Sequence, residues 1–197
     1  LELVQRVARL PIEQVLAPFV QGTLRVRDIE ESQKYAIVQH PKVLDWLLGY
    51  INPPDSIEQI LKDILEFDQK LYEPALRKAI ESDKQDFVLW LVKEKPELSQ
   101  KALLIAAAGS KSDIVRLLVA EDVSPDFQDA RGFTPLMYAV ANNNKLVVEF
   151  LIEKVDVNKT SVKDDANYPN ASALTLASCR GYVDMVTSLL EHGAQIN

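Results

Sequence analysis

The sequence predicts an all-α solenoid, a fold in which short helix–turn–helix units stack in a single row. One apolar pattern recurs four times, in PALRKAIESDKQDFVLWLV, KALLIAAAGSKSDIVRLLV, TPLMYAVANNNKLVVEFLI and SALTLASCRGYVDMVTSLL. Cap and turn residues recur in register with the apolar ones, and self-similarity at such a period indicates a repeat architecture. We therefore predict helical hairpins over 74–92, 101–119, 134–152 and 172–190, preceded by a helical N-terminal region.

Each unit combines one helix of small residues with a second helix of bulky residues. In the third unit, Thr134 is suited to the N-cap because its hydroxyl accepts a bond from a free backbone N–H, and Pro135 follows at the first helical position. Asn143 occupies the turn, where a left-handed conformation is needed, and Gly181 takes that place in the last unit. Small side chains let the two helices approach closely. A hairpin of this size buries both faces only by stacking on its neighbours.

Residues 1–70 follow this pattern less closely. The segments ELVQRVARL and PIEQVLAPF are typical of short helices that cap the end of a stack. The segment 33–51 resembles the first repeat through HPKVLDWLLGYI, so it is a candidate for a further, degraded repeat. Ser56 and Gln59 form a capping box before an apolar stripe, which consists of Ile57, Ile60, Leu61, Ile64 and Leu65.

Composition and charge narrow the possible functions. The 197 residues carry a net charge of −7, which disfavours binding to nucleic acid, and the longest apolar run, 102–109, is too short to span a bilayer. The single cysteine excludes an internal disulfide and fits a reducing, cytoplasmic location. No signal peptide is evident, and the first residue is Leu rather than Met, so we expect a piece of a longer protein.

The sequence lacks the residue patterns that carry common catalytic chemistry. No phosphate-binding glycine loop, dinucleotide fingerprint or serine elbow occurs. His40, His192 and Cys179 do not have zinc-binding spacing, and a Cys179–His192 nucleophile pair is disfavoured because the repeat places the two at opposite ends of one unit. The adjacent carboxylates Asp164 and Asp165 indicate surface charge. We expect no enzymatic activity, no cofactor and no metal.

The third and fourth units resemble ankyrin repeats. Asp129, Gly132 and Thr134-Pro135-Leu136 are similar to the start of such a repeat, and Asp156-Val157-Asn158 to its close. The last unit ends similarly, on His192-Gly193-Ala194-Gln195-Ile196-Asn197. The resemblance implies a module that binds another protein through its concave face and finger loops, with repeats at about 71–99, 100–128, 129–160 and 161–197.

The chain departs from the family pattern at several positions, one of which is the absence of the glycine expected after Lys154. Met137 and Thr175 stand where the family usually has histidine, so its Thr–His hydrogen-bond network is absent. Between Asn158 and Ser172 the sequence holds about six residues more than the regular unit. These residues predict one finger longer than the rest, and loops carry function more often than their scaffold does.

The family resemblance indicates which positions contact a partner. In such repeats these positions lie beside the finger glycine, here Gly132, and just after the pair of small residues, here Ala139–Val140. With their counterparts in the last unit, they are Ala130, Arg131, Phe133, Ala141, Asn142, Tyr168, Pro169, Ala171, Cys179 and Arg180. Aromatic residues and arginine dominate the energetics of interfaces. We therefore predict partner contacts at Arg131, Phe133, Asn142, Tyr168 and Arg180, although Phe133 has the alternative of packing against the neighbouring finger. Two arginines in an acidic chain point to a carboxylate on the partner.

Several alternatives stay open at this point. Leu10 to Leu16, LPIEQVL, is similar to the opening of an F-box, with Lys34, Tyr35, Pro41 and Trp46 near its later features; this implies a ubiquitin-ligase adaptor. Pro18 opposes it, because proline is expected to break the first helix.

Two further alternatives are that the chain is the targeting region of a larger enzyme and that it is a bacterial effector in the host cytoplasm. We expect a monomer whose Met185, Val186 and Leu189 remain partly uncovered, which favours continuation of the array.

Overall fold

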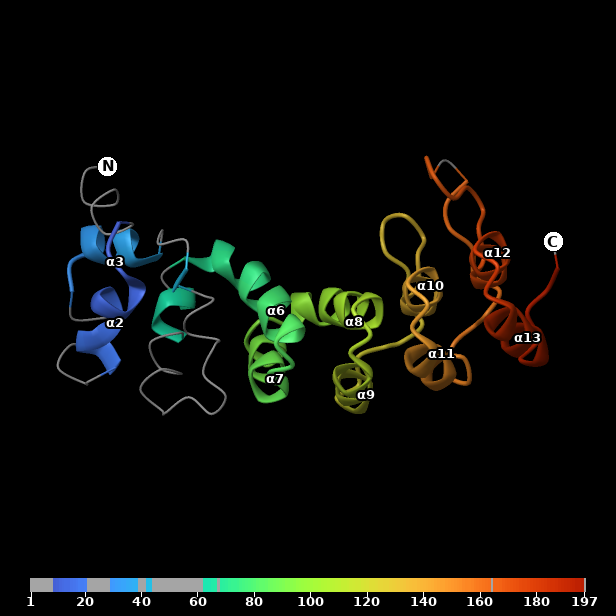
Figure 1. The fold of residues 1–197 in the computed structure, drawn as a ribbon, viewed down its shortest axis with the longest axis horizontal. Coiled ribbons are helices and arrows are strands. Elements are labelled where there is room, and N and C mark those ends of the chain that lie inside the picture. Colours follow the sequence, from blue (N-terminus) through green and yellow to red (C-terminus); the bar gives the residue numbers. More distant parts are fainter. Residues whose placement is uncertain are drawn as a thin grey trace. The chain divides into compact units, whose positions relative to one another are not determined.

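The computed structural model describes the parts of the chain for which we report structure, namely residues 9–20, 29–38, 42–43, 62–66, 68–163 and 165–196 (Figure 1). The chain divides into two compact units, Leu1–Lys84 and Gln85–Asn197. This division lies inside the first predicted repeat, 71–99, so the predicted boundaries at residue 70 and between repeats stay predictions. Within the described residues the regular structure is helical apart from one antiparallel bridge, between Thr160 and Ser172, which confirms the all-α fold.

In the first unit, helix α2, Ile12–Val20, lies in the segment predicted to be helical. The expectation that Pro18 breaks this helix is wrong, since the helix continues through it to Val20. Proline removes only its own backbone donor, which would bond the carbonyl of Gln14, and side-chain burial along the helix offsets that loss. Ile12, Leu16 and Phe19 form a buried stripe at helical spacing that holds the helix in place.

The described residues of the first unit also include helix α3 (Glu31–Val38), a helical turn over 62–66, the 3₁₀ turn η2 (Gln69–Leu71) and helix α6 (Tyr72–Glu81). Ile64 and Leu65 from the predicted apolar stripe are fully buried. Helix α6 buries Tyr72, Ala75, Leu76, Ala79 and Ile80. Pro41, Trp46 and residues 56–61 lie outside the described residues, so the capping box at Ser56 and the F-box features there stay predictions.

The second unit is a row of helical hairpins (Figure 1). It runs through α7 (Gln85–Glu94), the 3₁₀ turn η3 (Pro96–Leu98), α8 (Ser99–Ala108), α9 (Ser112–Ala120), α10 (Pro135–Ala141), α11 (Lys145–Leu151), α12 (Ala173–Cys179) and α13 (Val183–Glu191). Helix α8 packs against α10 and α10 against α12, while α9 packs against α11. The hairpins predicted at 101–119, 134–152 and 172–190 therefore lie side by side.

The turn inside each hairpin uses the same backbone conformation. Asp83, Ser110, Asn143 and Gly181 have φ values of 57°, 59°, 58° and 71°. Their spacings of 27, 33 and 38 residues are those that relate the four copies of the apolar pattern. This confirms the turn roles predicted for Asn143 and Gly181, and it shows that Asp83 and Ser110 serve in the same way.

Side-chain caps begin the first helices of the last two hairpins. The hydroxyl of Thr134 accepts a bond from the backbone N–H of Met137 at 3.2 Å, and Pro135 is the first residue of α10, as predicted. Ser172 caps α12 in the same way through the N–H of Thr175, at 3.2 Å. The hydroxyl of Thr175 lies 3.1 Å from that of Ser172, so these two side chains form a hydrogen bond of their own at the start of α12.

Buried polar groups join neighbouring hairpins. The amide of Asn144, which is only 6% exposed, donates to the carbonyl oxygens of Ala107 and Ala108 at 2.5 and 2.9 Å, and its oxygen accepts from the Ser110 hydroxyl. These carbonyls end helix α8 and have no partner within it. Asn144, in the turn of one hairpin, therefore supplies the hydrogen bonds that the last carbonyl groups of the preceding hairpin's first helix need.

A second link repeats along the loops between hairpins. The carboxylate of Asp126 accepts from the backbone N–H of Asp156, 3.1 Å away in the next repeat. The amide oxygen of Asn158 accepts in the same manner from the N–H of Gln195, at 2.8 Å. Because both acceptors sit at the close of a repeat, each polar side chain sets the position of the following loop.

The last hairpin corrects one expectation. Met185 and Leu189 are buried, contrary to the expectation, because α12 and α13 pack on each other, whereas Val186 is half-buried and so remains partly uncovered as expected. The exposed apolar residues of this segment are instead Val183, Leu190 and Ile196.

Candidate functional site

Two finger loops of the second unit meet at one surface. The long finger, residues 159–171, folds back on itself through the N–H of Ser161, which donates to the carbonyl of Ala171 at 3.0 Å. The N–H of Val162 donates to the carbonyl of Arg131 at 2.9 Å and so joins it to the preceding finger. The fingers touch at Gly132, where an added Cβ would lie 2.9 Å from the Val162 nitrogen. Only glycine permits this approach, and its φ of +74° also favours glycine.

The carboxylate of Asp129 shapes the preceding finger. One oxygen accepts from the N–H groups of Arg131 and Phe133, each at 2.9 Å, and the other accepts from the Tyr138 hydroxyl at 2.8 Å. Burial raises the pKa of Tyr138, and the bond to Asp129 raises this pKa further. Tyr138 therefore remains a hydrogen-bond donor that ties the finger to helix α10.

An ion pair connects the two fingers. The guanidinium of Arg131 contacts the carboxylate of Asp165 in a bidentate manner, with Nε–Oδ2 and Nη2–Oδ1 distances of 2.7 and 3.1 Å. The same carboxylate accepts from the N–H groups of Asn167 and Tyr168, at 3.0 and 2.8 Å. Arg131 and these N–H groups hold the pKa of Asp165 well below its usual range. The side chain of Asp165 is 4% exposed and that of Arg131 is 45% exposed, so Arg131 shields its partner.

Aromatic rings extend this contact toward helix α12. The ring of Phe133 lies 6.1 Å from that of Tyr168 in an edge-on arrangement, and the Arg131 guanidinium stacks 4.6 Å above Phe133. Arg180, at the end of α12, donates to the Tyr168 hydroxyl at 3.0 Å. Its Nη1 is buried and has no hydrogen-bond partner in the described part of the chain.

Four of the five predicted contact residues come together here. We use the name finger cluster for this group, which consists of Arg131, Phe133, Asp165, Tyr168 and Arg180. Phe133 is only 3% exposed, because Tyr138, Tyr168 and Arg131 surround its ring, so it supports the surface from below rather than forming it.

The fifth residue, Asn142, is exposed and caps α10 by donating to the carbonyl of Tyr138 at 2.9 Å. No interaction joins it to the cluster within the described residues.

Sequence reasoning missed Asp165. The interpretation of the Asp164–Asp165 pair as plain surface charge is wrong for Asp165, which organises the long finger, while Asp164 lies outside the described residues. The local signal was present, since an aspartate followed two and three residues later by free N–H groups is typical of a turn. Its partner Arg131 lies 34 residues away, and no local pattern indicates that pairing.

Other candidate chemistry is dispersed. Cys179 is exposed at the end of α12, whereas Nδ1 of His192 contacts the carbonyl of Ser188 at 2.8 Å, after α13. Across the ranges that the structure describes, no three acidic, histidine or cysteine side chains gather as a metal site. None of the helices in those ranges is both long and apolar enough to cross a bilayer.

Comparison with known proteins places the hairpin row in a family. A family model described as ankyrin repeats in three copies matches residues 36–161 and 103–197. The chain belongs to the ankyrin repeat family. The match begins at residue 36, inside the segment that is a candidate for a further, degraded repeat. Ankyrin repeats are protein–protein interaction modules, and as a family they are generally not enzymes.

Individual ankyrin repeat proteins show the same relationship. Human ankyrin repeat domain-containing protein 63 is 31% identical over 96 residues, which cover 48% of this chain and 25% of that protein. Human NF-kappa-B inhibitor alpha is 30% identical over 101 residues, which cover 51% of this chain and 32% of that protein. The mouse protein 63 is 31% identical over 96 residues, covering 48% of this chain and 24% of its own length. The matched region thus spans no more than a third of these relatives.

Proposed function

We propose that the chain binds a partner protein through the finger cluster and the adjoining concave face of its first helices. The observation that carries this proposal is the convergence of Arg131, Tyr168 and Arg180 on one partly exposed surface. Tyrosine and arginine on a rigid platform are the residues that most often dominate binding energy. Their hydrogen bonds hold them in place before binding, which reduces the entropy lost on association.

The chemistry of the surface favours a partner that supplies an acidic group. Arg180 is half-buried and forms no ion pair within the described residues, so its positive charge can pair with a carboxylate on the partner. Arg131 already faces Asp165, so we assign the partner's acidic group to Arg180 rather than to Arg131. The related NF-kappa-B inhibitor alpha is named for acting on NF-kappa-B, which supports a partner-directed role here.

Affinity capture from a cell lysate tests this proposal. The wild-type chain is compared with Tyr168→Ala and Arg180→Gln variants, and the captured proteins are quantified by mass spectrometry. Phe133→Ala is unsuitable because Phe133 is buried and its loss would disturb the fold. Glu153→Gln, on the exposed side of the second helices, is the matched control.

We expect the two finger variants to lose the same prey by about tenfold, while the control retains it. Equal recovery of prey by all variants would contradict the assignment of the finger cluster as the binding surface, although it would not bear on the fold. Three alternative predictions remain: an F-box adaptor, the targeting region of a larger enzyme, and a secreted effector. The proposal also includes a cytoplasmic location and a monomeric state.

A further inference from the structure

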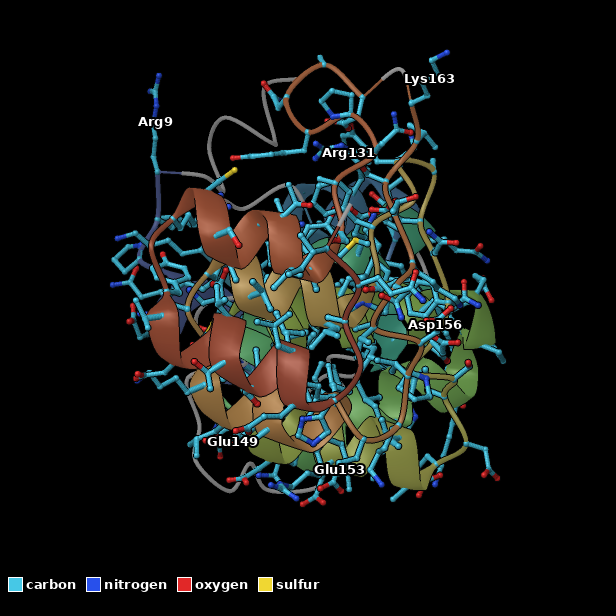
Figure 2. All side chains as sticks on the ribbon, turned by 90° about the vertical axis from the view of Figure 1, so that its right-hand side faces the viewer. Arg9, Arg131, Glu149, Glu153, Asp156 and Lys163 are labelled. Atoms are coloured by element: carbon cyan, nitrogen blue, oxygen red, sulfur yellow. The ribbon has the colours of Figure 1, made fainter. Side chains whose placement is uncertain are left out.

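A second surface of the ankyrin array lies away from the fingers, on the side formed by α9, α11 and α13. Figure 2 shows Arg131 and Lys163 at the finger end and Glu149 and Glu153, on and just after α11, at the opposite end. We call the latter side the second-helix face. It is not the surface used in the proposed function, and its residues are considered separately.

Phe150 of α11 stands at the centre of this face. Its ring is half-buried, with the guanidinium carbon of Arg116 at 4.4 Å and the ammonium nitrogen of Lys154 at 5.1 Å from the ring centre. Arg116 belongs to α9 in the preceding repeat, so the ring joins two repeats. Cation–π contacts hold both charges in place while their heads remain exposed.

These two cations differ from the ion-paired ones. Lys93, Arg131, Lys145 and Lys159 of the second unit each face a carboxylate within 3.2 Å. Arg116 and Lys154 form no ion pair and donate no side-chain hydrogen bond within the described residues, although the chain carries a net charge of −7. A guanidinium stacked on a ring keeps its N–H groups in its own plane, where they remain available to a carboxylate.

An exposed apolar residue completes the surface. Leu146 precedes Phe150 by four residues on α11, so the two share one side of the helix, and Leu146 is 64% exposed. Lys154 follows Phe150 by a further four residues. The second-helix face therefore presents an apolar contact next to two cations that form no ion pair with the residues the structure describes.

We propose that Arg116, Phe150, Lys154 and Leu146 form a docking surface for an acidic segment of a partner protein. Aspartate or glutamate side chains of that segment bind Arg116 and Lys154, and a neighbouring apolar side chain packs on Leu146 and Phe150. Charge complementarity selects this occupant. A nucleic acid is disfavoured because it brings a continuous run of phosphates to a chain of net charge −7, whereas a short acidic segment brings only the carboxylates that the two cations pair.

A phage-displayed library of short random peptides, selected on the whole chain, tests the proposal. We expect bound peptides to be enriched in an acidic residue next to an aliphatic or aromatic one. Fluorescence anisotropy with a labelled peptide from this set measures the affinity for each variant. The Arg116→Gln, Lys154→Gln double variant should bind it about tenfold more weakly, and added salt should weaken the wild-type complex.

Matched variants separate this surface from the finger cluster. Lys163→Gln removes an exposed cation from the long finger and should leave the affinity unchanged. Leu146→Ala should weaken binding without removing the preference for an acidic residue.

A selection with no acidic enrichment overturns the proposal, as does unchanged affinity in the double variant. The same holds if every selected peptide depends on Tyr168 and Arg180 instead, or if a DNA duplex or a phosphorylated peptide is strongly preferred.

Discussion

Arg131 and Asp165 lie 34 residues apart in the sequence and form a bidentate ion pair that joins two neighbouring fingers of the array. Asp165 also accepts hydrogen bonds from two backbone N–H groups of its own loop. One carboxylate therefore fixes the conformation of the long finger and holds it against the preceding finger. The surface that we propose for partner binding depends on this arrangement, because Tyr168, three residues after Asp165, donates its backbone N–H to that carboxylate.

Acid should weaken the long finger through Asp165. Its pKa is lowered in the folded chain, so its contribution to stability is present above the ordinary carboxyl pKa of about 4 and is lost as the pH falls through the lower folded value. Asp165→Asn should therefore lose stability at neutral pH and show a shallower decline in acid. Urea denaturation at several pH values checks this. Asp122→Asn, at an exposed turn that asparagine tolerates, serves as control, and identical pH profiles for the wild type and Asp165→Asn would contradict the prediction.

Gly132→Ala should lower the free energy of unfolding by about 2 to 4 kcal/mol, because alanine disfavours positive φ and its Cβ would strike the adjacent finger. Gly181→Ala provides a matched comparison, since its φ is +71° but its Cβ would meet nothing within 4 Å. That variant should lose only about 1 kcal/mol. Denaturant titration of both measures the difference, and equal losses would show that the fingers are not in close contact.

Removing the Asn144 side chain should lower the free energy of unfolding by about 2 kcal/mol, because the carbonyls of Ala107 and Ala108 would lose their donor in a buried place. The exposed neighbour Asn142, changed to alanine, should cost less than about 0.5 kcal/mol. Hydrogen exchange monitored by mass spectrometry should show the effect of Asn144→Ala at the α8–α9 turn. Unaltered protection there would argue against the link between repeats.

Asp129→Asn should lower the pKa of Tyr138 part of the way toward its ordinary value, since burial remains but the bond to a carboxylate is lost. A raised tyrosine pKa contributes stability below the ordinary value, and this contribution is lost as the pH rises through the folded value. Ultraviolet absorbance of the phenolate against pH follows the titration. An unshifted titration in the variant would mean that burial alone sets this pKa, whereas Asp156→Asn should leave it unchanged.

The sequence predicts local backbone features of this chain better than it predicts the arrangement of the candidate site. Thr134 as a cap, Pro135 as a first helical residue and Asn143 as a left-handed turn were all predictable, because each acts on backbone groups within a few residues of itself. The wrong expectation for Pro18 has a similar local origin. Proline propensity does not include the tertiary burial that keeps α2 intact.

Repetition in the sequence determined the hairpin row, because the apolar residues of one unit bury fully only against a near-copy of themselves. Tertiary structure alone decided which side chains remain available to a partner. Phe133 is covered by Tyr138 and Tyr168, Arg131 is engaged by Asp165, and Arg116 forms no ion pair with any residue in the described part of the chain. Each of these outcomes depends on distances between residues of different segments or repeats. A linear pattern does not record such distances, since the loops that set them vary in length from one repeat to the next.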